Sequence, residues 1–174
     1  MATIARWWQG KWARLIAALA ASAYFLYYAN TPTDWHFLDN LNLIIHEAGH
    51  WIFLPFGEFM HILGGSLFQS IFPLIYVGYF FLRKDYFSSS LLLFWTGQNL
   101  INVSVYAADA QKMLLPLLGG DGVIHDWNWL LSSTHTLQYT AQISSCIYGT
   151  GLMIVIAAAA LSIYFSQQNI PEAS

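Results

Sequence analysis

The residues best suited to chemistry in this chain are His46-Glu47-Ala48-Gly49-His50, an H-E-x-x-H motif. Positions i and i+4 share one face of a helix, so the two imidazoles can bind a single metal ion. Zinc accepts imidazole ligands at this spacing, and the adjacent carboxylate can act as a general base toward zinc-activated water. The motif therefore predicts a hydrolytic Zn²⁺ site, with His46 and His50 as metal ligands and Glu47 as the catalytic base.

The motif lies within an apolar stretch, between Leu43-Ile44-Ile45 and Trp51-Ile52-Phe53-Leu54. Short motifs of this kind also arise by chance. Ionisable side chains are costly at bilayer depth, however, and in that setting they mark functional sites. The apolar surroundings therefore favour a zinc site over a chance match.

A catalytic zinc needs a third protein ligand and one open position. The polar connection 109–136, interrupted by glycine and proline, offers Asp121 first, His125 second and Asp126 as a less favoured alternative. An unwound segment can approach such a site at membrane depth if protein buries it. The sequence leaves the choice among these three residues open.

Further polar side chains occur in the two apolar runs that precede this connection. They can line the site or hold substrate, or they can only join helices; they are His61, Gln69, Asn99 and Asn102. Asp39 precedes His46 by about 10 Å of helix rise. We therefore interpret Asp39 as an interfacial cap residue rather than as a partner of an imidazole.

The composition is that of an integral membrane protein. Hydrophobic residues make up 57% of the 174 residues and charged residues 9%, against about 25% charged residues in soluble domains. Eight Trp and ten Tyr suit the interfacial belts of a lipid bilayer. No basic patch is present, so nucleic acid is not an expected partner.

The apolar runs predict an all-α fold, a polytopic membrane helical bundle in one domain, residues 1–174. About five transmembrane helices are expected, at residues 13–29, 37–54, 61–82, 87–108 and 142–165. An irregular loop near the metal site follows the fourth helix. We interpret the first run as a retained anchor rather than a cleaved signal peptide, because it stays apolar and aromatic through Tyr28.

Cationic residues bias the orientation of five such spans. One side carries four of them and the other side two: Arg6, Lys11, Arg14 and Lys112 against Arg83 and Lys84. The expected location is a bacterial-type inner membrane with the N-terminus inside. The loop with Asp121 and His125 is then cytoplasmic, and the C-terminus lies outside.

The His46–His50 motif, followed after the fourth run by Leu114-Leu115-Pro116-Leu117-Leu118-Gly119-Gly120-Asp121-Gly122, resembles the site-2 protease family of intramembrane zinc metalloproteases. The similarity covers residues 37–126. It implies that His46, His50 and Asp121 are ligands and that Glu47 is the base. Gly119-Gly120 stand where the family usually has Pro-Leu, and His125-Asp126 are additional, so the third ligand stays open.

The function expected from these observations is that of a zinc metalloendopeptidase, which cleaves a membrane-embedded protein substrate within the lipid bilayer. The first alternative is a non-catalytic metal-binding or scaffold membrane protein of the same fold. A haem-binding redox protein is a second alternative. Haem ligation by two histidines draws on facing helices, whereas His46 and His50 lie one turn apart.

Overall fold

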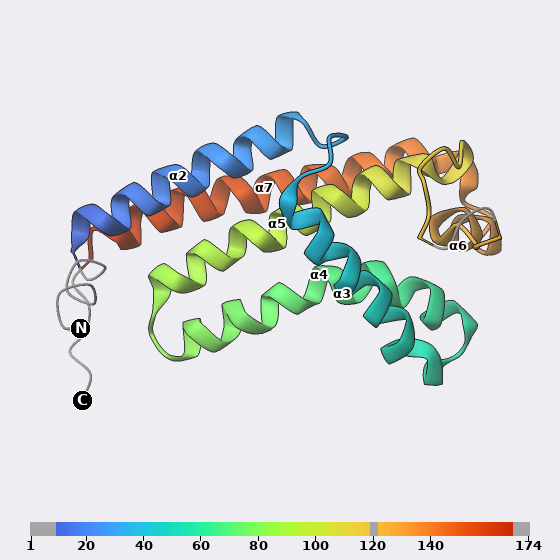
Figure 1. The fold of residues 1–174 in the computed structure, drawn as a ribbon, viewed down its shortest axis with the longest axis horizontal. Coiled ribbons are helices and arrows are strands. Elements are labelled where there is room, and N and C mark those ends of the chain that lie inside the picture. The colour runs from blue at the N-terminus through green and yellow to red at the C-terminus, as the bar shows by residue number, and fades with distance from the viewer. Residues whose placement is uncertain (1–9, 119–121, 169–174) are drawn as a thin grey trace.

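The computed structural model describes residues 10–118 and 122–168 (Figure 1). Across these ranges the chain forms six α-helices joined by turns and short 3₁₀ segments, without a β-strand. The all-α prediction is confirmed.

Five of the helices are long, and each coincides with a predicted apolar run. They are α2 (Lys11–Asn30), α3 (Phe37–Phe53), α4 (Glu58–Leu82), α5 (Tyr86–Ala108) and α7 (Thr140–Ser166). The sixth helix, α6 (Asp126–Ser133), lies in the connection that was predicted to be irregular. His125 caps it, because the His125 Nδ1 atom accepts the Asn128 N–H at 3.2 Å.

Glycine pairs let the helices that carry the site approach closely. A Cβ atom added to Gly64 of α4 would lie 2.7 Å from the Gly49 carbonyl oxygen of α3. On α5, a Cβ atom added to Gly97 would lie 2.8 Å from the Gly151 carbonyl oxygen of α7. Small residues allow this close contact between backbones, and the first pair presses the helix with the H-E-x-x-H motif onto α4.

Helices α2 and α7 run antiparallel along most of their length. The Arg14 guanidinium donates to the Phe165 carbonyl at 3.4 Å, and the Tyr148 hydroxyl donates to the Ala29 carbonyl at 2.9 Å. The rings of Tyr86 and Phe165 are 5.3 Å apart, so α5 begins at the same end of the bundle. The start of α2, the start of α5 and the end of α7 therefore lie together (Figure 1).

Helix α3 runs in the same sense as α2, although the two are consecutive. Antiparallel contacts pair α3 with α4 through His46 and Gln69, and α4 with α5 through Gln69 and Asn102. Since α5 in turn pairs antiparallel with α7, helices α2, α3 and α5 share one direction. The Tyr28 hydroxyl donates to Asp39 at 3.0 Å, which holds the first turn of α3 against the last turn of α2.

This arrangement differs from five alternating spans, in which consecutive helices point in opposite directions. Among the described residues, two helical stretches, Glu58–Leu82 and Leu137–Ser166, are long and apolar enough to cross a membrane. The five-span arrangement is therefore not confirmed, and the two stretches give weak support for membrane association.

Candidate metal centre

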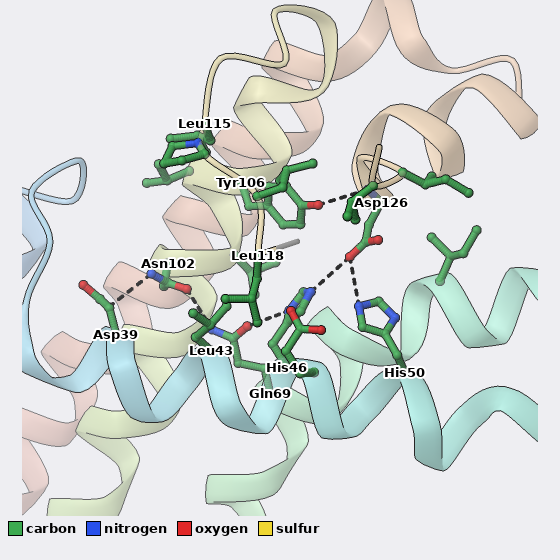
Figure 2. A pocket seen from close by; sticks show the side chains of 18 of the residues that line it. Asp39, Leu43, His46, His50, Gln69, Asn102, Tyr106, Leu115, Leu118 and Asp126 are labelled. Atoms are coloured by element: carbon green, nitrogen blue, oxygen red, sulfur yellow. Dashed lines mark hydrogen bonds and ion pairs between the residues drawn. The ribbon is translucent and has the colours of Figure 1, made fainter. Parts of the chain in front are cut away.

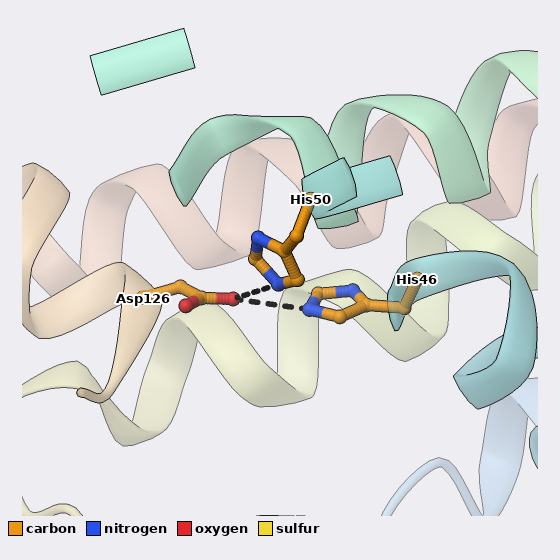
Figure 3. Close-up of side chains that lie close together, drawn as sticks. All are labelled: His46, His50 and Asp126. Atoms are coloured by element: carbon orange, nitrogen blue, oxygen red, sulfur yellow. Dashed lines mark hydrogen bonds and ion pairs between the residues drawn. The ribbon is translucent and has the colours of Figure 1, made fainter. Parts of the chain in front are cut away.

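Three side chains from two elements converge on one point (Figure 3). His46 and His50 project from α3, and Asp126 comes from the first turn of α6. The Asp126 Oδ2 atom lies 3.0 Å from the His46 Nε2 atom and 3.2 Å from the His50 Nε2 atom. A tetrahedral zinc ion, with bonds of about 2.0–2.1 Å, keeps its ligand atoms about 3.3 Å apart. The three side chains therefore match a zinc site in donor type and in spacing.

The outer nitrogen of each imidazole is held by an oxygen acceptor. The His46 Nδ1–H donates to the Gln69 Oε1 atom at 3.0 Å, and the His50 Nδ1–H donates to the His61 carbonyl at 2.8 Å. A neutral imidazole with its proton on Nδ1 presents an Nε2 lone pair. In that tautomer both lone pairs face the Asp126 carboxylate, an arrangement that a metal ion can bridge; without a metal, a proton on Nε2 makes the hydrogen bond to Asp126 instead. Metal-bound histidines are held in this way by their outer nitrogen.

Helix α4 leaves open the space that such a cation needs. Gly65 lies beside the two imidazoles, and a Cβ atom there would come within 2.6 Å of both Nε2 atoms. Any residue larger than glycine would enter the metal position or push the imidazoles aside. This is the second feature of the site that fits a metal.

Asp126 is held as an anionic ligand by its surroundings. Burial by itself raises the pKa of this carboxyl group, but hydrogen bonds with His46 and His50 outweigh the burial and leave the pKa below its ordinary value. The Asp126 N–H donates to the Tyr106 hydroxyl at 3.0 Å, and the Trp127 indole donates to the Ser66 hydroxyl at 3.1 Å. These two bonds fix the start of α6 over α5 and α4.

A cavity of about 540 Å³ opens in front of the three side chains (Figure 2). Glu47 lines it together with His46, His50 and Asp126. Its other walls come from the turn before α3, from α5 and from the segment after α5, including Trp35, Val103, Leu115 and Leu118. The cavity brings the Glu47 carboxylate and the candidate metal ligands to one space.

The structure separates two of the three candidates for the third ligand, His125 and Asp126. Asp126 joins the two histidines, whereas the His125 Nε2 atom faces the Asp109 carboxylate at 3.3 Å. Asp109 also accepts the N–H groups of Leu114 and Leu115, so His125 and Asp109 hold the segment after α5. Asp121 lies outside the described residues. The sequence contained one local sign for Asp126, an acidic residue in the first turn of a helix, but nothing local aims that residue at α3.

Three of the four additional polar residues touch the site. Gln69 accepts from His46, Asn102 accepts from Gln69, and the His61 carbonyl accepts from His50. Asn99 is buried on another face of α5, and its amide donates to the Trp95 carbonyl at 2.9 Å. Asp39 is a cap residue, as interpreted, because its Oδ2 atom accepts the His36 N–H at 2.7 Å.

Comparison with known protein families, with curated proteins and with solved structures found no match to this chain.

Proposed function

We propose that this chain is an intramembrane zinc metallopeptidase that hydrolyses a peptide bond of a membrane-embedded protein. The observation that carries the proposal is the convergence of two imidazole Nε2 atoms and one carboxylate on a single point, with Glu47 in the adjoining cavity. His46, His50 and Asp126 are the proposed ligands. Among the described candidates, this ligand set takes Asp126 in place of His125 as the third ligand.

The proposed chemistry follows from these positions. Zinc in a three-ligand site acts as a Lewis acid and lowers the pKa of a coordinated water. Glu47 lines the cavity together with His46 and His50, so its carboxylate can accept a proton from a water molecule there. It can then deliver that proton to the leaving nitrogen, as a general acid–base residue does.

The proposed substrate segment is apolar and locally extended. Apolar side chains form much of the cavity wall, among them Leu43, Ile62 and Leu118. A helix holds its carbonyl groups in internal hydrogen bonds, so a scissile carbonyl must leave the helix before it can be attacked. A segment that unwinds at the cavity satisfies both conditions.

We further propose four membrane passages, by α2, α4, α5 and α7, with α3 placed between α2 and α4 to carry the site. Four passages return the chain to its starting side, in keeping with the contact between Arg14 and Phe165. Helix α2 has 20 residues and α5 has 23, and about 20 are needed to cross. The modest hydropathy of α5 is compatible with a passage, because its polar side chains Thr96, Gln98 and Ser104 are buried.

The distribution of cations favours one orientation of these four passages. Lys11 and Arg14 lie at the end of the bundle where α2 begins, and Arg83 and Lys84 form the turn between α4 and α5 at that same end. Lys112 follows α5 at the opposite end. Because cationic loops stay in the cytoplasm, we propose that α2 begins inside and that the metal centre opens toward the outer face. The N-terminal orientation expected from the sequence is kept, and the sides of the loop after α5 and of the C-terminus are reversed.

The test compares the wild-type chain with the Glu47→Gln variant. Zinc is measured in detergent-purified protein by elemental analysis, and new N-termini of membrane proteins are mapped in cells that express either form. We expect about one zinc per chain in both forms, since Glu47 is not a ligand. New N-termini should accumulate at least about 100-fold more slowly with the variant, the usual loss on removing a general base.

Two results would contradict the proposal in different ways. Wild-type protein that is folded, never exposed to chelator and free of metal would remove the zinc site. Zinc in both forms together with identical N-termini would remove the peptidase activity and favour a non-catalytic metal-binding or scaffold protein.

A further inference from the structure

We infer that Asp39 is a positioning residue for the metal centre and that it acts on His46 through Asn102 and Gln69. The inference rests on the proposed zinc site but not on peptide hydrolysis. Asp39 lies at the start of α3, two turns before His46, and contacts neither imidazole. Its influence follows a chain of hydrogen bonds that leaves α3, crosses α5 and α4, and returns to α3 (Figure 2).

The chain of hydrogen bonds is continuous and short at each step. The Asn102 amide donates to the Asp39 Oδ1 atom at 3.1 Å. The Gln69 amide donates to the Asn102 Oδ1 atom at 2.8 Å, and the His46 Nδ1–H donates to the Gln69 Oε1 atom at 3.0 Å. Asp39 and Gln69 are each 2% exposed, and Asn102 between them is half-buried at the wall of the cavity.

Asp39 sets the direction of every bond in this chain. An ionised carboxylate can only accept hydrogen bonds, so Asn102 must turn its NH₂ group toward Asp39 and its oxygen toward Gln69. Gln69 must then turn its NH₂ group toward Asn102 and its oxygen toward His46. The proton of a neutral His46 is thereby held on Nδ1, and the Nε2 lone pair is left for the metal.

The two oxygens of Asp39 have separate tasks. The Oδ2 atom accepts the His36 N–H and caps α3, whereas the Oδ1 atom accepts from Asn102, from Gln98 at 3.0 Å and from Tyr28 at 3.0 Å. A helix cap requires only the first of these bonds. The three donors on Oδ1 satisfy the acceptor capacity of this oxygen in a buried position.

Gln98 provides a matched control inside the same network. Like Gln69 it is a buried glutamine, and like Asn102 it donates to Asp39, but its oxygen accepts from the Asn42 amide at 2.8 Å and does not face an imidazole. Loss of Gln98 removes a hydrogen bond to Asp39 without interrupting the path from Asp39 to His46.

The experiment measures zinc affinity of the full-length chain in detergent, by competition with a chromophoric chelator. The variants are Gln69→Met, Asn102→Leu, Gln98→Met, and Asn102→Leu combined with Gln69→Glu. We expect Gln69→Met to weaken zinc binding about 10- to 100-fold and Asn102→Leu about 10-fold, as for other partners of metal ligands. Gln98→Met should leave the affinity within about twofold of wild type.

The double variant tests the direction of the bonds rather than their number. A glutamate at position 69 presents only oxygens to His46, whatever residue 102 does. Zinc affinity should therefore recover toward wild type in the double variant, although the bond to Asn102 is still missing. The visible spectrum of Co²⁺-loaded protein should change in Asn102→Leu and return in the double variant, since it reports the geometry of the ligands.

Equal losses in Asn102→Leu and Gln98→Met would make the effect one of general stability and overturn the inference. No loss in Asn102→Leu, or no recovery in the double variant, would overturn it as well. Thermal unfolding of each variant shows whether the protein tested is folded. If the wild-type protein binds no metal at all, the proposed zinc site itself is wrong. If wild type binds zinc and these substitutions leave the affinity unchanged, only the role of Asp39 is wrong.

Discussion

At the scale of single residues, neighbouring side chains at the start of α6 have different tasks. His125 is the N-cap residue with an extended backbone and faces Asp109, whereas Asp126 begins the helix and faces α3. His125 and Asp126 are both candidate metal ligands in the sequence, and the backbone geometry at the start of α6 gives them different partners.

Alanine substitutions should separate these tasks. Asp126→Ala should lower zinc from about one per chain to a small fraction, because two histidines alone bind zinc weakly. His125→Ala and Asp121→Ala should retain zinc, and elemental analysis of purified protein measures all three. Zinc that survives in Asp126→Ala but is lost in either of the other variants would reassign the third ligand.

At the scale of elements, the small residues of α4 decide how closely α3 and the metal can approach. Gly64 meets the backbone of α3 at Gly49, and one residue further along Gly65 faces both imidazoles. The same short stretch thus brings the motif helix close and leaves room for an ion. Gly78 of the same helix has open space at its Cβ position.

Gly65→Ala should remove zinc while the helices stay folded. Its methyl group would come within 2.6 Å of both Nε2 atoms, which displaces the imidazoles or fills the metal position. Gly78→Ala is the control, and it should keep zinc and stabilise α4 by up to about 1 kcal/mol through helix propensity. Zinc content and helix content by circular dichroism are measured together, and a Gly65→Ala protein with full zinc would contradict the site geometry.

The contact between α5 and α7 should depend on Gly151. A Cβ atom there would lie 2.7 Å from the Gly97 carbonyl and 2.9 Å from the Ile101 side chain, whereas Gly149 has open space. Overpacking of this kind costs about 1–3 kcal/mol. Gly151→Ala should therefore lower the unfolding temperature in detergent, and Gly149→Ala should not. Equal unfolding temperatures for the two variants would show that the helices do not pack closely at Gly151.

At the scale of the whole molecule, the direction of each helix decides which end of the bundle each loop occupies, and hence its side in the proposed membrane arrangement. Helix α3 runs with α2 instead of against it, so the start of α2 and the end of α7 share one end of the bundle. Among the described cations, Lys11, Arg14, Arg83 and Lys84 lie at that end, and Lys112 lies at the other.

Cysteine labelling should distinguish the two topologies. In a Cys146→Ser background, Lys112→Cys and Arg83→Cys are treated with a membrane-impermeant maleimide in sealed right-side-out vesicles. Four passages predict that only position 112 reacts before the vesicles are opened, whereas five alternating spans predict that only position 83 does. Labelling after detergent lysis shows that both sites are reactive, and early reaction at position 83 alone would refute the four-passage arrangement.

The sequence by itself determined the helical runs and the His46-Glu47-His50 motif. Helix periodicity and the i, i+4 relation are local, so they require no knowledge of distant contacts. Sequence reasoning could also select Gln69 and Asn102 as candidate site residues, because amides in apolar helices need polar partners. The sequence could not identify those partners, because a role in helix packing and a role in the site both explain a buried amide equally well.

Only the tertiary structure decided which described acidic side chain meets His46 and His50, the direction of α3 and the hydrogen bonds that connect Asp39 with His46. Asp126 lies 80 positions from His46 in the chain, and Asn102 lies 63 positions from Asp39. Contacts at such separations depend on how α4, α5 and α6 pack, which in turn depends on Gly49, Gly64 and Ser66 fitting opposite their partners. Local patterns predict which residues can bind a metal, and the packing of the helices selects which of them meet.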